Sequence, residues 1–172
     1  MKVSIKNNAQ GGFTLIELIV VIVILGILAA TALPKFASLG GDARLASLQA
    51  AKGALNATAA MAHGKYLVDP TVAKNLTFSV EGTTVNLYTG GYPKAEANTA
   101  EAAGVPNGTD YKVTVTAATT GSGATGASLK LVPMSLVGTT NETNCYLQYT
   151  ESTTGAAPTI ALATTATAAN CN

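Results

Sequence analysis

The sequence predicts an α+β fold, in which one long N-terminal helix packs against a small antiparallel β-sheet and a C-terminal loop is closed by a disulfide. Three observations predict it. Residues 18–33 form an apolar run without a charged side chain. Apolar residues then recur at helical spacing between residues 36 and 63, and from about residue 75 the pattern alternates with period two. A helix followed by a run of strands indicates an α+β architecture.

The composition excludes several functional classes. Charged residues make up only 11% of the chain, less than half the average for a soluble domain. The formal net charge of +1 provides no basic field for nucleic acid. One histidine and two cysteines leave little material for a metal cluster or for a nucleophile paired with a base. The sequence therefore predicts a protein that is not an enzyme, with no catalytic residue, cofactor, metal site or nucleic-acid partner.

The apolar segment is long enough to span a membrane. Residues 13–33 carry a single charge, Glu17, and as a helix they reach about 31 Å, the thickness of a bilayer hydrocarbon core. Lys2 and Lys6 precede the segment, so the positive-inside rule keeps the N-terminus in the cytoplasm and the rest of the chain is exported. A lone carboxylate in such a segment costs about 2.5 to 3.5 kcal/mol, so Glu17 needs a partner.

Two ordinary interpretations of this segment stay open. The first is a cleaved secretory signal with an A-x-A site at residues 30–32, which releases a globular binding protein that starts at Leu33. The second is an N-terminal anchor that is never cut. Glu17 weakens both, because neither interpretation gives the carboxylate a partner.

Residues 11–30, GGFTLIELIVVIVILGILAA, resemble the start of a type IV prepilin. The resemblance implies that residues 1–12 are a leader, that prepilin peptidase cleaves between Gly12 and Phe13, and that the new amino group of Phe13 is methylated. Removing 12 of the 172 residues leaves a mature subunit of 160. The superfamily with this motif also includes the pseudopilins of type II secretion.

Cleavage also gives Glu17 a partner. It creates a cation at the Phe13 nitrogen, four positions before Glu17, and residues four apart share one face of a helix. These opposite charges offset the cost of burial, either within one subunit or between neighbours in a fibre. We take the pairing between neighbours as the hypothesis, because it sets the register of a homopolymer.

The expected helix covers residues 13–64 and is about 78 Å long. Residues 13–34 lie in the membrane before assembly and in the fibre core afterwards. The amphipathic remainder is covered on one face by a globular β domain, residues 65–172. The resemblance implies that Gly26 and Pro34, both unfavourable inside a helix, bound a stretch that extends or unwinds in the filament; the alternative is a simple kink at Pro34.

Two further features lie along this helix. Gly40 and Gly41 interrupt its sequence and have no evident role. His63, the only histidine, is next to the predicted helix end and is expected to stabilise the negative end of the helix dipole.

Strands are expected at residues 75–80 and 83–88, joined into a hairpin by a two-residue turn at Glu81 and Gly82. Further strands are expected at residues 111–117, 128–132, 145–150 and 159–163. Segments rich in Gly, Thr and Asn at residues 119–127 and 139–144 are expected to be loops. The elements predict an antiparallel sheet of four to six short strands over the amphipathic part of the helix.

Cys145 and Cys171 are 26 residues apart, and an even number of cysteines in an exported chain indicates a disulfide. Closing a loop of this size stabilises a fold by about 3 to 4 kcal/mol in the entropic model. Two unpaired thiols are the alternative. The resemblance to type IV pilins implies the same disulfide-bounded loop, residues 145–171, which major pseudopilins usually lack.

Among pilins, residues 31–36, 39–44 and 48–53 (TALPKF, LGGDAR and LQAAKG) are similar to the mannose-sensitive haemagglutinin pilins of type IVa, and the similarity extends to about Val68. It implies a subunit that is stored in the inner membrane, polymerised by a pilus assembly platform into an extracellular fibre, and used for attachment to host or environmental surfaces. The alternatives are a type II secretion pseudopilin and the secreted protein released after Ala32.

The ligand of such a fibre is not readable from the motif, but carbohydrate is one candidate. Five tyrosines provide aromatic surface for a sugar, although packing in the core or at a subunit interface is the favoured interpretation. They are Tyr88, Tyr92, Tyr111, Tyr146 and Tyr149.

Overall fold

The computed structural model describes residues 12–119, 126–152 and 154–172. Of the expected leader only Gly12 lies within these ranges, and most of the loop expected at residues 119–127 lies outside them. The chain divides into two units, Met1–Ala37 and Ser38–Asn172.

One helix of 54 residues, α1 (Leu15–Val68), runs from the first unit into the second. The expected end at Gly64 is wrong, because helical residues continue to Val68. The helix ends at Asp69, whose backbone is extended (φ −115°, ψ 105°). Asp69 precedes Pro70, and proline drives the residue before it out of the helical region.

Two short helices were not expected from the sequence. They are α2 (Pro70–Asn75) and α3 (Ala97–Ala102), each of six residues. The Asp69 side chain caps α2 by accepting the Thr71 N–H at 2.9 Å, and this hydrogen bond lowers the pKa of Asp69. Segments this short contain too few turns for a helical period to be visible in the sequence.

The expected hairpin is present as β1 (Thr77–Val80) and β2 (Thr83–Asn86). The two turn residues both have positive φ, 48° at Glu81 and 88° at Gly82. This is the backbone of the two-residue turn whose twist matches that of the flanking strands.

The other four strands form a separate antiparallel sheet in the order β3-β4-β5-β6. They are β3 (Tyr111–Thr116), β4 (Ser128–Pro133), β5 (Leu147–Thr150) and β6 (Thr159–Leu162). Two 3₁₀ helices, η1 (Met134–Leu136) and η2 (Thr140–Thr143), connect β4 to β5. The expected single sheet is therefore two sheets: the four strands β3 to β6 form one, and the hairpin β1-β2 forms the other.

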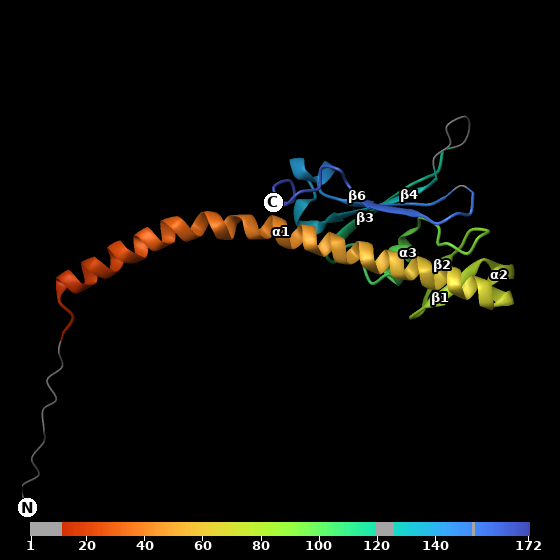
Figure 1. Ribbon diagram of the computed structural model, residues 1–172, viewed down its shortest axis with the longest axis horizontal. Helices are drawn as coiled ribbons and strands as arrows, with labels where there is room; N and C mark the ends of the chain where they lie inside the picture. The colour runs from red at the N-terminus through yellow and green to blue at the C-terminus, as the bar shows by residue number, and fades with distance from the viewer. Residues whose placement is uncertain (1–11, 120–125, 153) are drawn as a thin grey trace, which may run out of the picture. The chain divides into compact units, whose positions relative to one another are not determined.

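In the second unit, the four-stranded sheet packs against α1 (Figure 1). Leu48, Ala51 and Leu55 of α1 are buried there, as their helical spacing predicts. The sheet contributes alternate residues from each strand, chiefly Leu129, Leu131, Leu147, Tyr149 and Ile160.

The hairpin packs near the end of α1. Ala62 forms a second buried cluster with Phe78, Val85 and Leu87. Burial of one face by both sheets explains why residues 39–68 of α1 are amphipathic.

Candidate functional site

The first unit presents an apolar helix surface without cover. None of the most apolar window of α1 is buried within the described chain, and α1 is long and apolar enough to cross a membrane. Large side chains are exposed along this half, from Leu15 at 75% to Phe36 at 67%. Lipid or other protein chains are required to shield this surface from water.

Glu17 bonds to Thr14 at the start of α1. Its carboxylate accepts both the Thr14 N–H and the Thr14 hydroxyl, each at 2.8 Å, and the Glu17 N–H donates to Thr14 Oγ1 at 3.3 Å. Reciprocal bonds between Thr and a Glu three residues later form a capping box. The Thr-x-x-Glu signature is visible in the sequence, but the partner expected for Glu17 was Phe13.

Before cleavage, Glu17 pairs with Thr14 and not with Phe13. Phe13 is joined to Gly12 in this chain, so its nitrogen is an uncharged amide. Glu17 already has hydrogen-bond partners before cleavage, and these reduce the penalty for placing its carboxylate near lipid. Pairing with the Phe13 cation is a property of the cleaved chain and stays a prediction.

The helix is unbroken at the two expected weak points. Gly26 and Pro34 both lie within the helical residues of α1, and a Cβ at Gly26 would meet nothing within 4 Å. Pro34 has no N–H, so the carbonyl one turn earlier lacks its helical donor. Extension or unwinding at these positions belongs to the assembled state and stays a prediction.

The second half of α1 exposes a row of small residues, which we call the small-residue face. Its members alternate in spacing of three and four and are all exposed: Ala43, Ala46, Ala50, Gly53, Ala57, Ala60 and Gly64. A Cβ at Gly53 or Gly64 would meet nothing within 4 Å. A repeat of 3.5 residues keeps one face in line along a helix, and small side chains permit close approach of a second helix.

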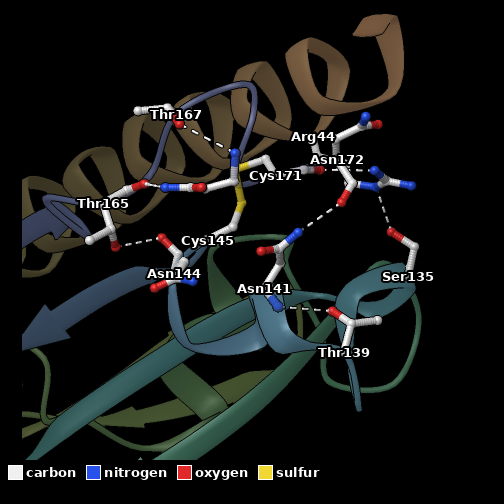
Figure 2. The surroundings of a disulfide bond; sticks show 11 residues. Arg44, Ser135, Thr139, Asn141, Asn144, Cys145, Thr165, Thr167, Cys171 and Asn172 are labelled. Atoms are coloured by element: carbon white, nitrogen blue, oxygen red, sulfur yellow. Dashed lines mark hydrogen bonds between the residues drawn. A yellow bond between two sulfur atoms is a disulfide. The ribbon is translucent and has the colours of Figure 1, made fainter. Parts of the chain in front are cut away.

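The disulfide between Cys145 and Cys171 is present and both residues are fully buried, which confirms the expected pairing (Figure 2). The Cα atoms lie 5.2 Å apart, within the usual range for a disulfide. The bridge holds the last residues of the chain, which we call the C-terminal strap (residues 163–172), against the globular unit.

Arg44 of α1 also holds the strap (Figure 2). Its Nη1 donates to the Cys171 carbonyl at 2.8 Å, and its Nε donates to Ser135 Oγ at 2.7 Å. Asn141 donates to the Asn172 carbonyl at 3.0 Å. The bonds from the charged Arg44 guanidinium are stronger than bonds between neutral groups. The strap is therefore fixed to α1 through Arg44 and to the loop before β5 through Asn141.

Gly41 is the point at which the strap crosses α1. A Cβ at this residue would lie 1.9 Å from the Ala168 carbonyl oxygen. Only glycine permits such a close backbone approach. Gly41, which had no role in the sequence, therefore makes room for the strap.

His63 does not cap the end of α1, because the helix continues past it to Val68. Its Nδ1 lies 2.7 Å from the Gly90 carbonyl oxygen, and its ring stacks on Tyr92 with 4.4 Å between centroids. His63 instead fixes the loop after β2 to the helix. The basic residue in the last turn of α1 is Lys65, and its Nζ lies 3.8 Å from Asp69 Oδ2.

Glu151 is a buried carboxylate that the sequence analysis did not single out. It is 6% exposed. Its Oε1 accepts the Tyr88 hydroxyl at 2.7 Å and the Ala127 N–H at 2.9 Å, and its Oε2 accepts the Ala95 N–H at 2.8 Å. These bonds join the loop after β2 to the four-stranded sheet. A single acid between strands gives no sequence signal, since its donors come from distant segments.

The tyrosines mainly serve packing. Tyr111 and Tyr149 are buried, and Tyr88, Tyr92 and Tyr146 are half-buried. The hydrogen bond to Glu151, together with burial, raises the pKa of Tyr88 to about 12. Burial, with the Glu151 charge, also raises the pKa of Tyr149.

Comparison with known families agrees with the motif at the start of the chain. Residues 7–33 match the family model described as the prokaryotic N-terminal methylation motif. The start of the chain therefore carries a motif of the type IV pilin and pseudopilin family. Its long helix, antiparallel sheet and C-terminal disulfide form a pilin-like α+β fold. No curated protein and no solved structure matches the chain.

Proposed function

We propose that this pilin-like protein is the structural subunit of a type IV pilus of the mannose-sensitive haemagglutinin type, an extracellular fibre that attaches cells to host or environmental surfaces. The observation that carries the proposal is the methylation motif at residues 7–33 on an apolar helix with no cover of its own. Such a helix is stable in lipid before assembly and among copies of itself afterwards.

In this proposal the chain is first a precursor in the inner membrane. Prepilin peptidase removes residues 1–12 and Phe13 is methylated. The new cation at Phe13 then competes with Thr14 for Glu17, and the neighbouring subunit's Glu17 sets the register as the assembly platform adds each copy. Removal of Lys2 and Lys6 changes 10 basic residues to 8 against 9 acidic ones, and a nearly neutral subunit avoids repulsion between copies.

The small-residue face supports close packing of the second half of α1 in the fibre. Seven exposed Ala and Gly residues in a row leave the backbone accessible to a neighbouring helix, whereas large side chains would hold it away. The disulfide-bounded loop, residues 145–171, favours a surface pilus over a type II pseudopilus, because the resemblance to pilins implies such a loop and major pseudopilins usually lack it.

The first test is the mass of the mature chain and its location. A methylated Phe13 start, with the protein in fibres sheared from the cell surface, is the expected result. A Leu33 start in soluble protein would overturn the proposal, and a Phe13 start without surface fibres would favour the pseudopilus.

The second test separates the roles of Glu17. Glu17→Gln is expected to be inserted and cleaved normally but to yield few sheared fibres, because the charge that pairs with Phe13 is lost. Thr14→Ala is the matched control, since it removes the capping hydroxyl and keeps the carboxylate. Normal fibre yield from Glu17→Gln cells would contradict the charge pair.

A further inference from the structure

The two edges of the four-stranded sheet are protected differently. The β3 edge is closed by the preceding loop. Val113 donates its N–H to Asn107 Oδ1 at 2.8 Å, and the Tyr111 carbonyl accepts the Gly108 N–H at 2.8 Å. Backbone groups at the start of this edge are therefore occupied, which is one way proteins prevent edge-to-edge pairing.

The β6 edge has no such cover. Ala163 donates its N–H to the Tyr146 carbonyl at 2.9 Å, and antiparallel pairing alternates every second residue. Ala161 therefore bonds to β5, whereas the N–H and C=O groups of Ile160 and Leu162 face away from it. Within residues 12–119, 126–152 and 154–172, no hydrogen bond reaches these four groups.

The segment that contains β6 also lacks the usual protection against pairing. No charged side chain occurs after Glu151 in the sequence, although edges are normally guarded by charges, especially lysine. The segment itself therefore adds no charge that would repel a second copy; on the same face of the sheet, Lys130 lies over the Tyr146 ring, 4.2 Å from its centroid. Ala161 is small and exposed, and beside it the outer face of the sheet is hollowed by a groove of about 290 Å³, so the Ala161 side chain leaves room for a second strand.

We propose that β6 is a self-pairing edge, at which two copies of this chain join their sheets in antiparallel fashion about Ala161. In this register Ile160 lies opposite Leu162 of the second copy, and each such pair exchanges two backbone hydrogen bonds. The four free groups of each copy are then satisfied. Ala161 lies opposite Ala161 of the second copy, where two small side chains fit at a position of close approach.

When the two β6 edges pair, the inner faces of the two sheets become one continuous surface. Ile160 is 8% exposed and Leu162 is half-buried, and both lie on the face that packs toward α1. Opposed on neighbouring strands, they continue the apolar core from one copy into the next. A two-fold pair is closed and does not propagate, so this contact is distinct from fibre growth. It is weak for a single pair and strengthened where many copies are displayed together.

Cysteine cross-linking of the full-length chain in membranes tests the proposal without requiring fibres. Opposed residues that do not exchange backbone bonds have Cα atoms about 4.5 Å apart, inside the range in which disulfides form. Ala161→Cys is therefore expected to give about tenfold more oxidised dimer than Thr114→Cys, because close pairing raises the effective thiol concentration. Thr114 is the matched control, since it is exposed and lies on the closed β3 edge.

The register gives a second, independent readout. Thr159 is expected opposite Ala163 of the second copy, so mixed Thr159→Cys and Ala163→Cys chains should cross-link more than either chain alone. Mass spectrometry of the linked peptides and of the Cys145 to Cys171 bridge verifies the site and the fold. Equal cross-linking at Ala161→Cys and Thr114→Cys, or no preference for the mixed pair, would overturn the proposal. Neither result bears on whether the chain forms fibres.

Discussion

The two halves of α1 have the same backbone conformation but opposite environments. Residues 18–33 carry no charged side chain, and their large apolar side chains are all exposed; Leu25, for example, is 57% exposed. In residues 39–68 one face is buried by the two sheets, with Leu48 and Leu55 at 0% exposure, and another face carries only small residues. The difference in burial therefore assigns a different role to each half of α1. The second half holds the fold of the subunit, and the first half is available for lipid and for other copies.

The largest expected effect tests this separation directly. Leu55→Ala is expected to lower the free energy of unfolding of the globular unit by about 2 to 5 kcal/mol, because it leaves a cavity in the core. Leu25→Ala removes the same atoms from an exposed position and is expected to leave that free energy unchanged. Chemical unfolding in detergent, followed by the tyrosine near-UV signal, measures both. Equal losses in the two variants would contradict the comparison.

The disulfide acts on the second unit alone. Replacing Cys145 and Cys171 together by serine is expected to lower the free energy of unfolding by about 3 to 4 kcal/mol, since the loop of 26 residues is no longer closed in the unfolded chain. The same unfolding assay applies. A free-thiol assay that finds two reactive thiols in the unreduced wild type would instead show that the bridge does not form.

Two glycines in α1 sharpen the comparison between a covered and an open helix face. Gly41→Ala is expected to destabilise the unit by about 1 to 3 kcal/mol, because the new methyl overlaps the strap. Gly53→Ala is expected to stabilise it by about 0.5 to 1 kcal/mol, because alanine favours the helix and meets nothing within 4 Å. Thermal unfolding measures both variants. The melting temperature is expected to fall for Gly41→Ala and to rise for Gly53→Ala, and a change of the same sign in both would contradict the comparison.

The smallest expected effect concerns Tyr88. Tyr88→Phe is expected to lower the free energy of unfolding by about 1 kcal/mol at neutral pH, because Glu151 loses one of its donors. The folded-state pKa of Tyr88, about 12, is above the ordinary value near 10. Its contribution is therefore complete below pH 10 and is lost as the pH rises toward 12.

A stability profile at alkaline pH measures this contribution. The wild type is expected to lose more stability than Tyr88→Phe between about pH 10 and 12. Parallel profiles in the two proteins would show that the hydroxyl bond to Glu151 does not contribute.

Much of the fold could be predicted because its signals are local. The turn at Glu81 and Gly82, the alternation in β3 and the spacing of Leu48 and Leu55 each follow from a short window of sequence. The misses have different causes. The end of α1 follows from a local signal that was overlooked, the restriction before Pro70, and His63 lost its expected role once the helix extended past it. The buried bonds of Glu151 come from segments far apart in the chain.

The sequence by itself determined the methylation motif, the apolar half of the helix, the strands and the cysteine pair, because these depend on composition, period and spacing along the chain. Only the tertiary structure decided why Gly41 is glycine, why Glu151 is buried, which face of α1 stays open and which sheet edge is left without cover. These properties arise where residues distant in sequence meet. A close approach or an unpaired backbone group exists only after the segments around it have packed.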